Sequence, residues 1–457
     1  MMNVKTKEQK RTPPGPKGNF LLGNLGDFGQ DPPNFLVHLA EEYGPVSRLR
    51  VGPYKMYLVA HPDLVRQVLV SQVDNFPKSR LDQRFLGKFL GRGLLLSNGD
   101  FHRRQRALIQ PAFHARRIEA YGRTMVDYTR RMLDAWSPGQ VLDVDHEMMR
   151  LTMFIVAKTL FDADVSATAE RAGEAIQTLQ EAANVELNRS FAMPMWIPTA
   201  NNRRFRRARS VVDEVILGII AQRRASATNG QVEDTGDLLS MLLLAKDEDG
   251  RAMNDQEIRD EAVTLFAAGH ETTSNATAWT WYFLSQNPDV EARLHAEVDA
   301  VLDGRPPTVA DLKNLTYTEM VLKESLRLRP PAWALAARTV LEDTEIGDYT
   351  IPAGSTIFVS PYQLHRLPEY FPDPERFDPE RFTPENEKKL PRYAYLPFGA
   401  GPRICIGNSF AMMEAHLILA TVAQHYGPEL VPGQEVEMAP LITLTPANGL
   451  KMRAIAR

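Results

Sequence analysis

One cysteine stands alone in the chain, at position 405, in a loop rich in glycine. It is the only cysteine among 457 residues, so no disulfide can form within the chain. The surrounding residues 398–407 read FGAGPRICIG, and this density of glycine and proline favours a tight loop over a helix or strand. Backbone N–H groups in such a loop can turn toward one sulfur and stabilise a thiolate, which is the form that binds metal. A buried, inert cysteine is the alternative, and the glycine-arginine frame favours the metal ligand.

A polar turn, AGHETT at residues 268–273, interrupts an otherwise helical pattern. Glycine and adjacent threonines are poor helix formers, so some other property must account for them. Threonine hydroxyls inside a helix bond back to carbonyls and locally open the hydrogen-bond ladder. Glu271 and Thr272 pair an acid with an alcohol, and such groups can pass protons through a dry site. A mildly destabilised polar turn without a catalytic role is the alternative.

Two further pairs of polar residues have helical spacing. Glu324 and Arg327 are three residues apart on one predicted helix face, which suits an ion pair. Alone, such a pair is a surface salt bridge of little energetic value. His102 and Arg106 are four apart and also share a face, and a solvated basic helix is the alternative there.

The periodicity predicts the elements that must position these groups. A helix is predicted from about 255 to 286, with a capping box at Asn254 and Glu257 and a stop at Asn287-Pro288. At 1.5 Å per residue it spans about 50 Å, enough to cross the molecule. A second helix follows the cysteine from residue 408, so the sulfur lies near a helix N-terminus, where negative charge is favoured.

The rest of the pattern predicts a helix-rich body with a small β portion. Runs at 46–52 and 55–60, joined by Gly52-Pro53, predict a hairpin, and residues 61–328 are mostly helical. Length alone suggests about three domains. The pattern instead predicts a polar, proline-rich segment over 1–18 and one domain over 19–457.

Composition limits the classes of function and location. The chain is 44% hydrophobic and 24% charged with a net charge of −4, so no global attraction to nucleic acid is expected. No apolar run approaches the roughly 18 residues that cross a bilayer, and the N-terminus lacks the apolar core of a signal peptide. With a single free thiol, these features predict a cytoplasmic protein without a transmembrane anchor. A chain whose anchor had been removed would have the same features.

Residues 398–407 resemble the haem-binding loop of the cytochrome P450 family, Phe-x-x-Gly-x-Arg-x-Cys-x-Gly. All five fixed positions match: Phe398, Gly401, Arg403, Cys405 and Gly407. The resemblance covers nearly the whole chain and implies a mainly α, single cytochrome P450-like fold, with haem b between two central helices. It also implies that the Cys405 thiolate ligates the haem iron and pushes electron density toward the metal.

Residues 268–273 are similar to the oxygen-binding motif of the same family. The resemblance implies that Glu271 and Thr272 relay protons to the dioxygen that the iron activates. It implies that Ala268, one turn earlier, keeps that helix face open for the haem.

The resemblance also implies groups that support the haem. Glu324 and Arg327 match the family's Glu-x-x-Arg, which joins an arginine of a Pro-Glu-Arg-Phe segment, here Arg381. This network would brace the loop that carries the cysteine. Partners for the haem propionates are implied at four positions: His102, Arg106, Arg338 and Arg403. Many family members carry Trp where this chain has His102, so an imidazole donor replaces an indole donor.

The resemblance places the substrate pocket on mostly apolar segments, which favours a hydrophobic substrate. These segments are 85–96, 184–196, the helix near Phe266, 333–335 and 441–444. Core packing explains the same residues equally well. Residues 191–198 and the arginines of 203–209 form either a flexible entrance lid or a membrane-surface contact, and the lid is favoured.

No flavin, nicotinamide or iron–sulfur motif is present, so a separate electron donor is expected, such as a ferredoxin or flavodoxin with its reductase. An acidic partner is expected to dock on basic residues near the thiolate: Arg103, Arg104, Lys388, Lys389 and Arg392. The predicted activity is that of a monomeric monooxygenase that inserts one atom of O₂ into a hydrophobic substrate, by hydroxylation or epoxidation.

Two other functions stay open from the sequence. A non-catalytic haem or small-molecule sensor would need no proton relay. A peroxide-driven peroxygenase of the same family typically lacks the acid–alcohol pair, so Glu271 and Thr272 argue against it.

Overall fold

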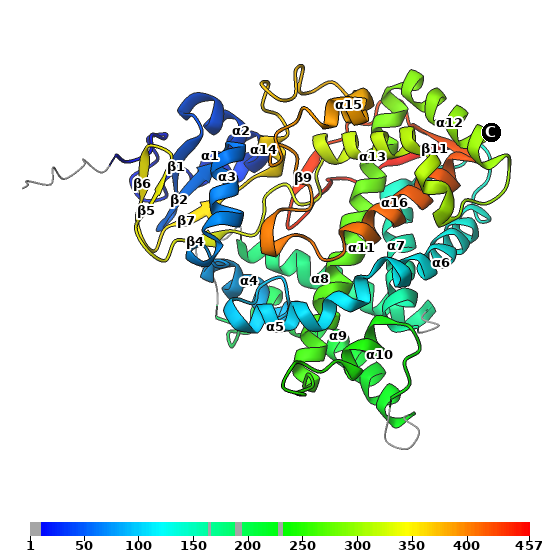
Figure 1. The fold of residues 1–457 in the computed structure, drawn as a ribbon, viewed down its shortest axis with the longest axis horizontal. Helices are drawn as coiled ribbons and strands as arrows, with labels where there is room; N and C mark the ends of the chain where they lie inside the picture. Colours follow the sequence, from blue (N-terminus) through cyan, green and yellow to red (C-terminus); the bar gives the residue numbers. More distant parts are fainter. Residues whose placement is uncertain (1–10, 163–165, 188–193, 227–231) are drawn as a thin grey trace, which may run out of the picture.

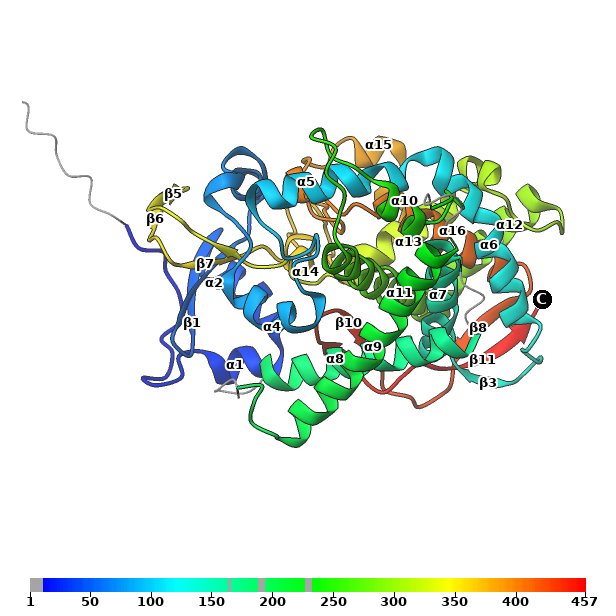
Figure 2. The ribbon, with the colours of Figure 1, turned by 90° about the horizontal axis from the view of Figure 1, so that it is seen from below.

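Helices make up most of the molecule, and small sheets lie toward two opposite ends of it (Figures 1 and 2). The computed structural model describes residues 11–162, 166–187, 194–226 and 232–457. The predicted mainly α architecture with a small β portion is confirmed.

The helices of the first half of the chain are α1 (Leu25–Gln30), α2 (Pro32–Tyr43), α3 (Pro62–Arg66), α4 (Arg80–Leu90), α5 (Gly99–Ile109), α6 (Ala115–Leu133), α7 (Val144–Phe161), α8 (Ser166–Leu187) and α9 (Ala200–Ala225). Those of the second half are α10 (Leu238–Leu244), α11 (Asp255–Gln286), α12 (Pro288–Leu302), α13 (Thr316–Leu328), α14 (Pro361–Leu364), α15 (Pro384–Glu387) and α16 (Asn408–Ala423).

The strands are β1 (Val46–Val51), β2 (Tyr54–Val59), β3 (Val141–Asp143), β4 (Arg338–Thr339), β5 (Thr344–Ile346), β6 (Tyr349–Ile351), β7 (Thr356–Phe358), β8 (Tyr426–Leu430), β9 (Met438–Pro440), β10 (Leu444–Pro446) and β11 (Lys451–Ala456).

Helix α11 runs through the middle of the molecule, and its predicted bounds are confirmed (Figure 1). The Asn254 side chain accepts from the Glu257 N–H at 2.9 Å, and the Glu257 carboxylate accepts from the Asn254 N–H at 2.9 Å. This capping box satisfies two backbone donors that a helix start leaves open. The helix stops before Asn287-Pro288 as predicted, and α7 and α16 both pack against it.

The larger sheet has the strand order β1-β2-β7-β4. Strands β1 and β2 form the predicted hairpin, with Val46 opposite Val59 and the turn at Gly52, whose φ is +57°. Strand β7 adds parallel to β2, and β4 adds antiparallel to β7. This order carries Arg338, the first residue of β4, from the late part of the chain to a position beside Lys78.

The other strands form three small sheets. One has the order β3-β11-β8 and lies near the C-terminus, and the pairs β5-β6 and β9-β10 are antiparallel hairpins. The turn between β9 and β10 holds residues 441–443, which return toward α11.

The largest apolar cluster fills the space between α6, α7, α11, α12, α13 and α16. Trp279 and Trp281 of α11 are at most 1% exposed, and most of α16 is buried around them. Burying a large apolar side chain stabilises a fold by roughly 1.5–3 kcal/mol, so this cluster holds α11 and α16 firmly against each other. These two helices carry or follow the residues of both chemical motifs.

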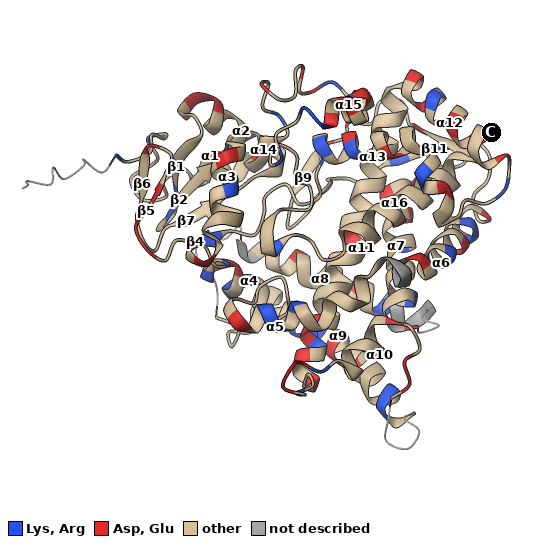
Figure 3. Ribbon diagram, viewed as in Figure 1, with Lys and Arg blue, Asp and Glu red and all other residues tan. Residues whose placement is uncertain are grey.

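Acidic and basic residues are interspersed around the outside of the ribbon, with no face of a single sign in this view (Figure 3). This distribution agrees with the small net charge. Among the described residues, no helix is both long and apolar enough to cross a membrane.

Candidate active site

The cysteine loop is tightly turned, as its glycines predict. Gly399 and Gly401 have φ of +70° and +69°, values that favour glycine. A Cβ at Gly401 would lie 2.1 Å from the carbonyl oxygen of Leu69, so any side chain there would displace the loop. The Cys405 N–H donates to the Phe398 carbonyl at 2.9 Å and closes the loop. Helix α16 begins three residues later, as predicted.

The Cys405 side chain lies on the wall of a large internal cavity. Its exposed surface faces this cavity and is enclosed by protein, so burial raises the pKa of the thiol. The Gly407 N–H and the positive charge of Arg106 both lower that pKa. Arg106 also donates to the Ile404 carbonyl at 2.7 Å. It therefore holds the loop in place and also puts a positive charge beside the sulfur. A metal cation at the sulfur would add the attraction that a thiolate needs.

The cavity has a volume of about 1270 Å³ and separates the cysteine loop from α11. Most of its lining is apolar, and four of the five predicted segments contribute to it. Their lining residues are Phe85, Leu86, Phe89, Leu90, Leu94, Leu95, Leu265, Ala267, Trp333, Ala334, Leu335, Leu441, Ile442 and Thr443.

The fifth predicted segment, 184–196, differs from expectation. Residues 188–193 and the side chains of residues 184, 186 and 187 lie outside what the structure describes. Of the rest of the segment, Val185 and residues 194–196 do not line the cavity. Helix α8 contributes Gln180 instead. The proposed lid or membrane contact at 191–198 falls partly outside the described residues, and within the described part Trp196 is 79% exposed. The sequence interpretation also missed Phe20, Leu21 and Leu22, which line the cavity near the N-terminus.

Ala268, Glu271 and Thr272 of α11 all line the cavity together with Cys405. The Thr272 hydroxyl donates to the Ala268 carbonyl at 2.7 Å, so its hydrogen is engaged in the helix while its oxygen remains able to accept. The back-bond from a threonine hydroxyl is confirmed, and α11 stays continuously helical through this turn. Phe398 lines the cavity next to the cysteine loop.

The Glu271 carboxyl is held by two residues that the sequence interpretation missed. Thr443 donates to one oxygen at 2.5 Å, and Gln180 of α8 donates to the other. Asn275, one turn along α11, donates to the Thr443 hydroxyl at 3.0 Å and orients it. Burial raises the pKa of Glu271, and the two hydrogen bonds lower it. No local motif could reveal these contacts, because α8, α11 and the turn before β10 are far apart in sequence.

Basic side chains from distant segments gather along one part of the cavity wall. All four predicted residues are there, and Lys78 joins them: Lys78, His102, Arg106, Arg338 and Arg403. Arg403 donates to the Ser97 carbonyl at 2.6 Å and to the Asn98 side chain at 3.1 Å. Lys78 could not be predicted from the sequence, because a single lysine before a helix carries no pattern.

Among the described residues, this basic cluster holds more positive than negative charge. Burial and then the charge of Arg403 lower the pKa of His102 to about 3. Burial lowers the pKa of Arg338 and of Arg403 to about 10 each. Asp82 is the nearby carboxyl, and its own pKa is raised by burial to about 6.

Arg338 gives the most direct test of whether a ligand belongs here. Its side chain is 4% exposed, and its Nε and Nη1 atoms have no hydrogen-bond partner among the described residues. Buried guanidinium donors are normally paired, so they fit an anionic ligand with acceptor oxygens. The two propionates of haem have this chemistry, and the residues present therefore fit the group.

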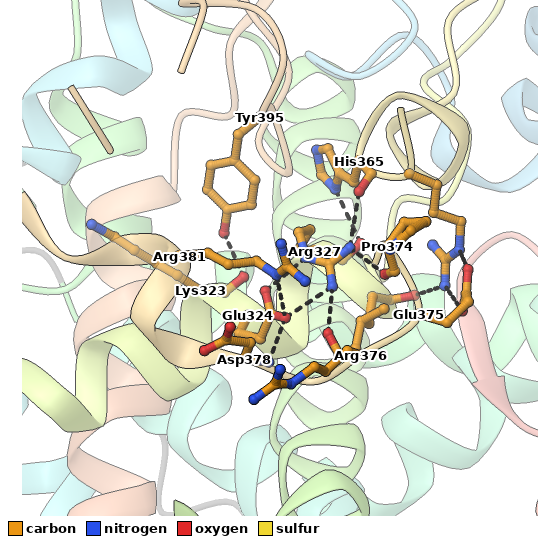
Figure 4. A network of polar contacts seen from close by, with 12 residues as sticks. Lys323, Glu324, Arg327, His365, Pro374, Glu375, Arg376, Asp378, Arg381 and Tyr395 are labelled. Atoms are coloured by element: carbon orange, nitrogen blue, oxygen red, sulfur yellow. Dashed lines mark hydrogen bonds and ion pairs between the residues drawn. The ribbon is translucent and has the colours of Figure 1, made fainter. Parts of the chain in front are cut away.

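The predicted brace behind the cysteine loop is confirmed (Figure 4). Arg327 is fully buried and donates to Glu324 at 2.7 and 2.8 Å. Arg381 lies 3.4 Å from the same carboxylate. Three carbonyls accept the other Arg327 donors: His365, Pro374 and Arg376. A buried ion pair is useful only when its remaining donors are satisfied, and here they are.

The brace reaches the cysteine loop through His365. Its Nε2 accepts from the Leu396 N–H at 2.9 Å, two residues before the loop begins. Its Nδ1 then carries the hydrogen and donates to the Arg327 carbonyl at 3.3 Å. The ion pair is thus connected to the loop entry by one neutral imidazole.

The chain belongs to the cytochrome P450 family. The family model "Cytochrome P450" matches residues 13–452. A solved structure described as "Retinoic acid bound cyanobacterial CYP120A1" superimposes with a TM-score of 0.87, at 25% identity, over 98% of this chain and 100% of that one. The protein is therefore a haem-iron oxidoreductase that uses O₂, a hydrophobic substrate and a redox partner.

Two curated relatives narrow the activity to monooxygenation. Cyclooctat-9-en-7-ol 5-monooxygenase of Streptomyces melanosporofaciens is 40% identical over 420 residues, covering 90% of this chain and 88% of the relative. Pentalenene oxygenase of Streptomyces avermitilis is 33% identical over 447 residues, covering 96% of each. The predicted monooxygenase function is confirmed at this level, and the sensor alternative has no support from these relatives.

Proposed function

We propose that this monooxygenase hydroxylates a cyclic terpene or terpene alcohol. The observation that carries the proposal is the apolar cavity of about 1270 Å³ that contains both Cys405 and Thr272 on its wall. The printed names of the relatives point to the same substrate class, because cyclooctat-9-en-7-ol and pentalenene are the compounds named in them. An apolar cavity with few polar groups orients a hydrocarbon by shape, so it suits regioselective attack on a C–H bond.

Haem b is the proposed cofactor, held by residues of the cavity wall. Cys405 would ligate the iron, and the basic cluster would pair with the propionates: His102, Arg106, Arg338 and Arg403, with Lys78 added. Phe398 and Ala268 would contact the ring. The thiolate-ligated iron supplies oxygen activation, because the sulfur donates electron density that favours O–O cleavage.

Glu271 and Thr272 are proposed to supply the protons that oxygen cleavage consumes. The Thr272 oxygen can accept a hydrogen bond inside the cavity, which supports its role as the inner group. Burial raises the pKa of Glu271, which favours the protonated form of a carboxyl group that lies beside the cavity. Its carboxyl contacts Thr443 and Gln180, so we infer that it turns from these partners to deliver the proton.

Electrons are proposed to come from a ferredoxin or flavodoxin that docks behind the cysteine loop. A hollow of about 660 Å³ lies there, lined by loop residues and by Lys313 and Arg392. Lys388 and Lys389 are exposed near this surface. Arg104 does not belong to the predicted docking surface. Its guanidinium already contacts Asp247 at 2.5 Å and Glu257 at 3.5 Å within the protein. Arg103 pairs with Asp100.

Three sequence-based expectations complete the proposal. They are action as a monomer, location in the cytoplasm, and a division into an N-terminal segment over 1–18 and a domain over 19–457. The single family match over residues 13–452 supports one continuous domain over most of the chain.

The substrate proposal is tested by adding pentalenene, cyclooctat-9-en-7-ol, a steroid and a fatty acid to the haem-loaded protein. Displacement of the iron-bound water shifts the haem spectrum, and products are then identified after turnover with a surrogate ferredoxin and reductase. We expect the two terpene-derived compounds to shift the spectrum and to gain one hydroxyl. Turnover of the fatty acid or steroid alone would overturn the substrate class and leave the monooxygenase assignment intact.

A further inference from the structure

The segment 91–98, between α4 and α5, lies unusually close to the first half of α11. A Cβ on Gly91, whose φ is +64°, would lie 2.1 Å from the Asp260 carboxylate. A Cβ on Gly93 would lie 2.1 Å from the Thr264 hydroxyl. Glycine at both positions therefore lets the backbone of the segment rest directly on the helix.

Two carboxyl groups of α11 hold this backbone. Asp260 accepts from the Arg92 N–H at 2.8 Å, and Glu261 accepts from the Leu94 N–H at 2.9 Å. The two residues are 6% and 1% exposed. A segment without regular structure must find acceptors for its buried N–H groups elsewhere, and here side chains of the helix provide them.

The two carboxyl groups have different electrostatic surroundings. Arg259 donates to Asp260 at 3.1 Å and to Asp213 of α9 at 2.7 Å, so Asp260 has a cation beside it. Burial raises the pKa of Glu261 to about 8, the Leu94 N–H lowers it, and Asp260 and Glu257 raise it. Glu261 is therefore mostly a neutral acid near pH 7, and glutamine matches that form in shape and as an acceptor.

The held segment reaches two parts of the active site. Leu94 and Leu95 line the substrate cavity. At the other end, the Ser97 carbonyl and the Asn98 side chain accept from Arg403. Any shift of the segment along α11 would thus reshape the cavity wall and alter the surroundings of Arg403.

We propose that Glu261 is a positioning residue for substrate selection. Its carboxyl oxygen accepts a hydrogen bond from the Leu94 N–H, and this bond fixes the part of the cavity wall that residues 91–98 form. The proposal deepens the proposed function and rests on the cavity being the substrate site. Glu261 touches neither the cavity nor the reacting groups in the described contacts, so its effect would pass through the segment alone.

The test compares wild type with Glu261→Leu, which removes the acceptor, and Glu261→Gln, which keeps it. Hydrogen exchange of the holoenzyme is read at the Leu94 amide by mass spectrometry. The same proteins are titrated with imidazole and with 4-phenylimidazole, which bind haem iron and differ by one ring inside the cavity. The ratio of the two Kd values depends on the position of the cavity wall, because only the larger ligand reaches it. This measurement does not require the terpene substrate to be known.

We expect Glu261→Leu to speed exchange at Leu94 by about tenfold and to change the Kd ratio by about fivefold, the size of one lost hydrogen bond. Glu261→Gln should stay within about twofold of wild type, as a retained acceptor requires. Gly93→Ala keeps Glu261 but pushes the segment off Thr264, and it should resemble Glu261→Leu if a displaced segment causes both effects. Glu261→Ala also removes the acceptor, and it decides the question if the leucine variant does not fold. Unchanged exchange and ratio in both variants, or a glutamine variant that behaves like the leucine variant, would overturn the proposal.

Discussion

At the scale of single residues, the chemistry depends on side chains that the fold leaves incompletely paired. Cys405 faces a cavity, Arg338 has two unpartnered buried donors, and the Thr272 oxygen can accept inside the same space. The two free donors of Arg338 would be costly in a protein without a ligand, because buried polar groups are normally satisfied. Together they describe a site built for a bound group with a metal and negative charges.

Thr272→Ala should uncouple electron consumption from product formation. Loss of the hydroxyl removes the inner proton-handling group, so reduced oxygen is released as peroxide. We expect product per NADPH consumed to fall by about ten- to a hundredfold, at or below the lower end of the effect of positioned proton donors. Peroxide and product are measured in the same turnover assay.

Thr272→Ser is the matched control, because it keeps the hydroxyl and should retain most of the coupling. Full coupling in the alanine variant would contradict the role assigned to Thr272.

Arg338→Leu should weaken haem binding. The guanidinium has buried Nε and Nη1 donors that are free for propionate oxygens. A hydrogen bond to a charged group contributes about 1.5–3 kcal/mol, so the rate of haem transfer to apomyoglobin should rise by roughly ten- to a hundredfold. Arg103→Leu removes an exposed arginine on α5 and should leave that rate unchanged. Equal rates in both variants would show that Arg338 does not hold the haem.

The sequence predicted most of these residues because family motifs are local. Cys405, Arg403 and Thr272 sit in short patterns that can be recognised without a structure. Lys78 and Gln180 sit in no such pattern, and they meet the site only because β4 and α8 fold beside it. Residues brought in by tertiary contacts are the ones that sequence reasoning missed.

At the scale of elements, capping and turn chemistry decided which predictions succeeded. The bounds of α11 were predicted correctly because a capping box and an Asn-Pro stop act within a few residues. The hairpin of β1 and β2 followed from its turn. The parallel addition of β7 to β2 joins segments about 300 residues apart, and no local signal indicates it.

The connection between the brace and the cysteine loop makes stability depend on pH. Burial and then the charge of Arg327 lower the pKa of His365 to about 3. Protonation would also place a hydrogen on Nε2, which now accepts from the Leu396 N–H. Between about pH 6.5 and pH 3 the unfolded chain therefore binds a proton at this residue that the folded chain does not. The contribution of neutral His365 to the free energy of unfolding is present above pH 6.5 and is lost as the pH falls from about 6.5 to about 3.

His365→Gln should reduce this loss. Its amide can still accept from Leu396 but takes up no proton, so the slope of unfolding free energy against pH should decrease by up to about 1.4 kcal/mol per pH unit below pH 6. Urea unfolding at a series of pH values measures the slope. An identical slope in His365→Gln and wild type would contradict the pKa assignment.

At the scale of the whole molecule, the cavity lies between two differently built faces. Apolar side chains of α4, the following segment and the turn before β10 surround the substrate side. Behind the cysteine loop lies the smaller hollow with Lys313 and Arg392 at its edge. This arrangement would let an organic substrate occupy the cavity while an electron donor docks behind the cysteine loop.

Arg392→Glu should weaken docking of an acidic donor. Reversing one exposed charge near the hollow should raise the KM for a ferredoxin several-fold at low salt, with kcat little changed, because rim charges mainly affect encounter. Added salt should shrink the difference between variant and wild type. Arg203→Glu on α9 is the control and should leave the KM for ferredoxin unchanged. If the KM for ferredoxin is the same in wild type and Arg392→Glu and does not change with ionic strength, this docking surface is excluded.

We infer that the sulfur of Cys405 makes this cavity an oxygenase site for a hydrophobic substrate. The most direct test of this inference is turnover of pentalenene and cyclooctat-9-en-7-ol under isotopically labelled O₂, comparing wild type with Cys405→His at equal haem content. We predict a wild-type product with one labelled oxygen and almost no product from the haem-containing variant. Unlabelled product from wild type, or equal oxygenation by Cys405→His, would contradict it.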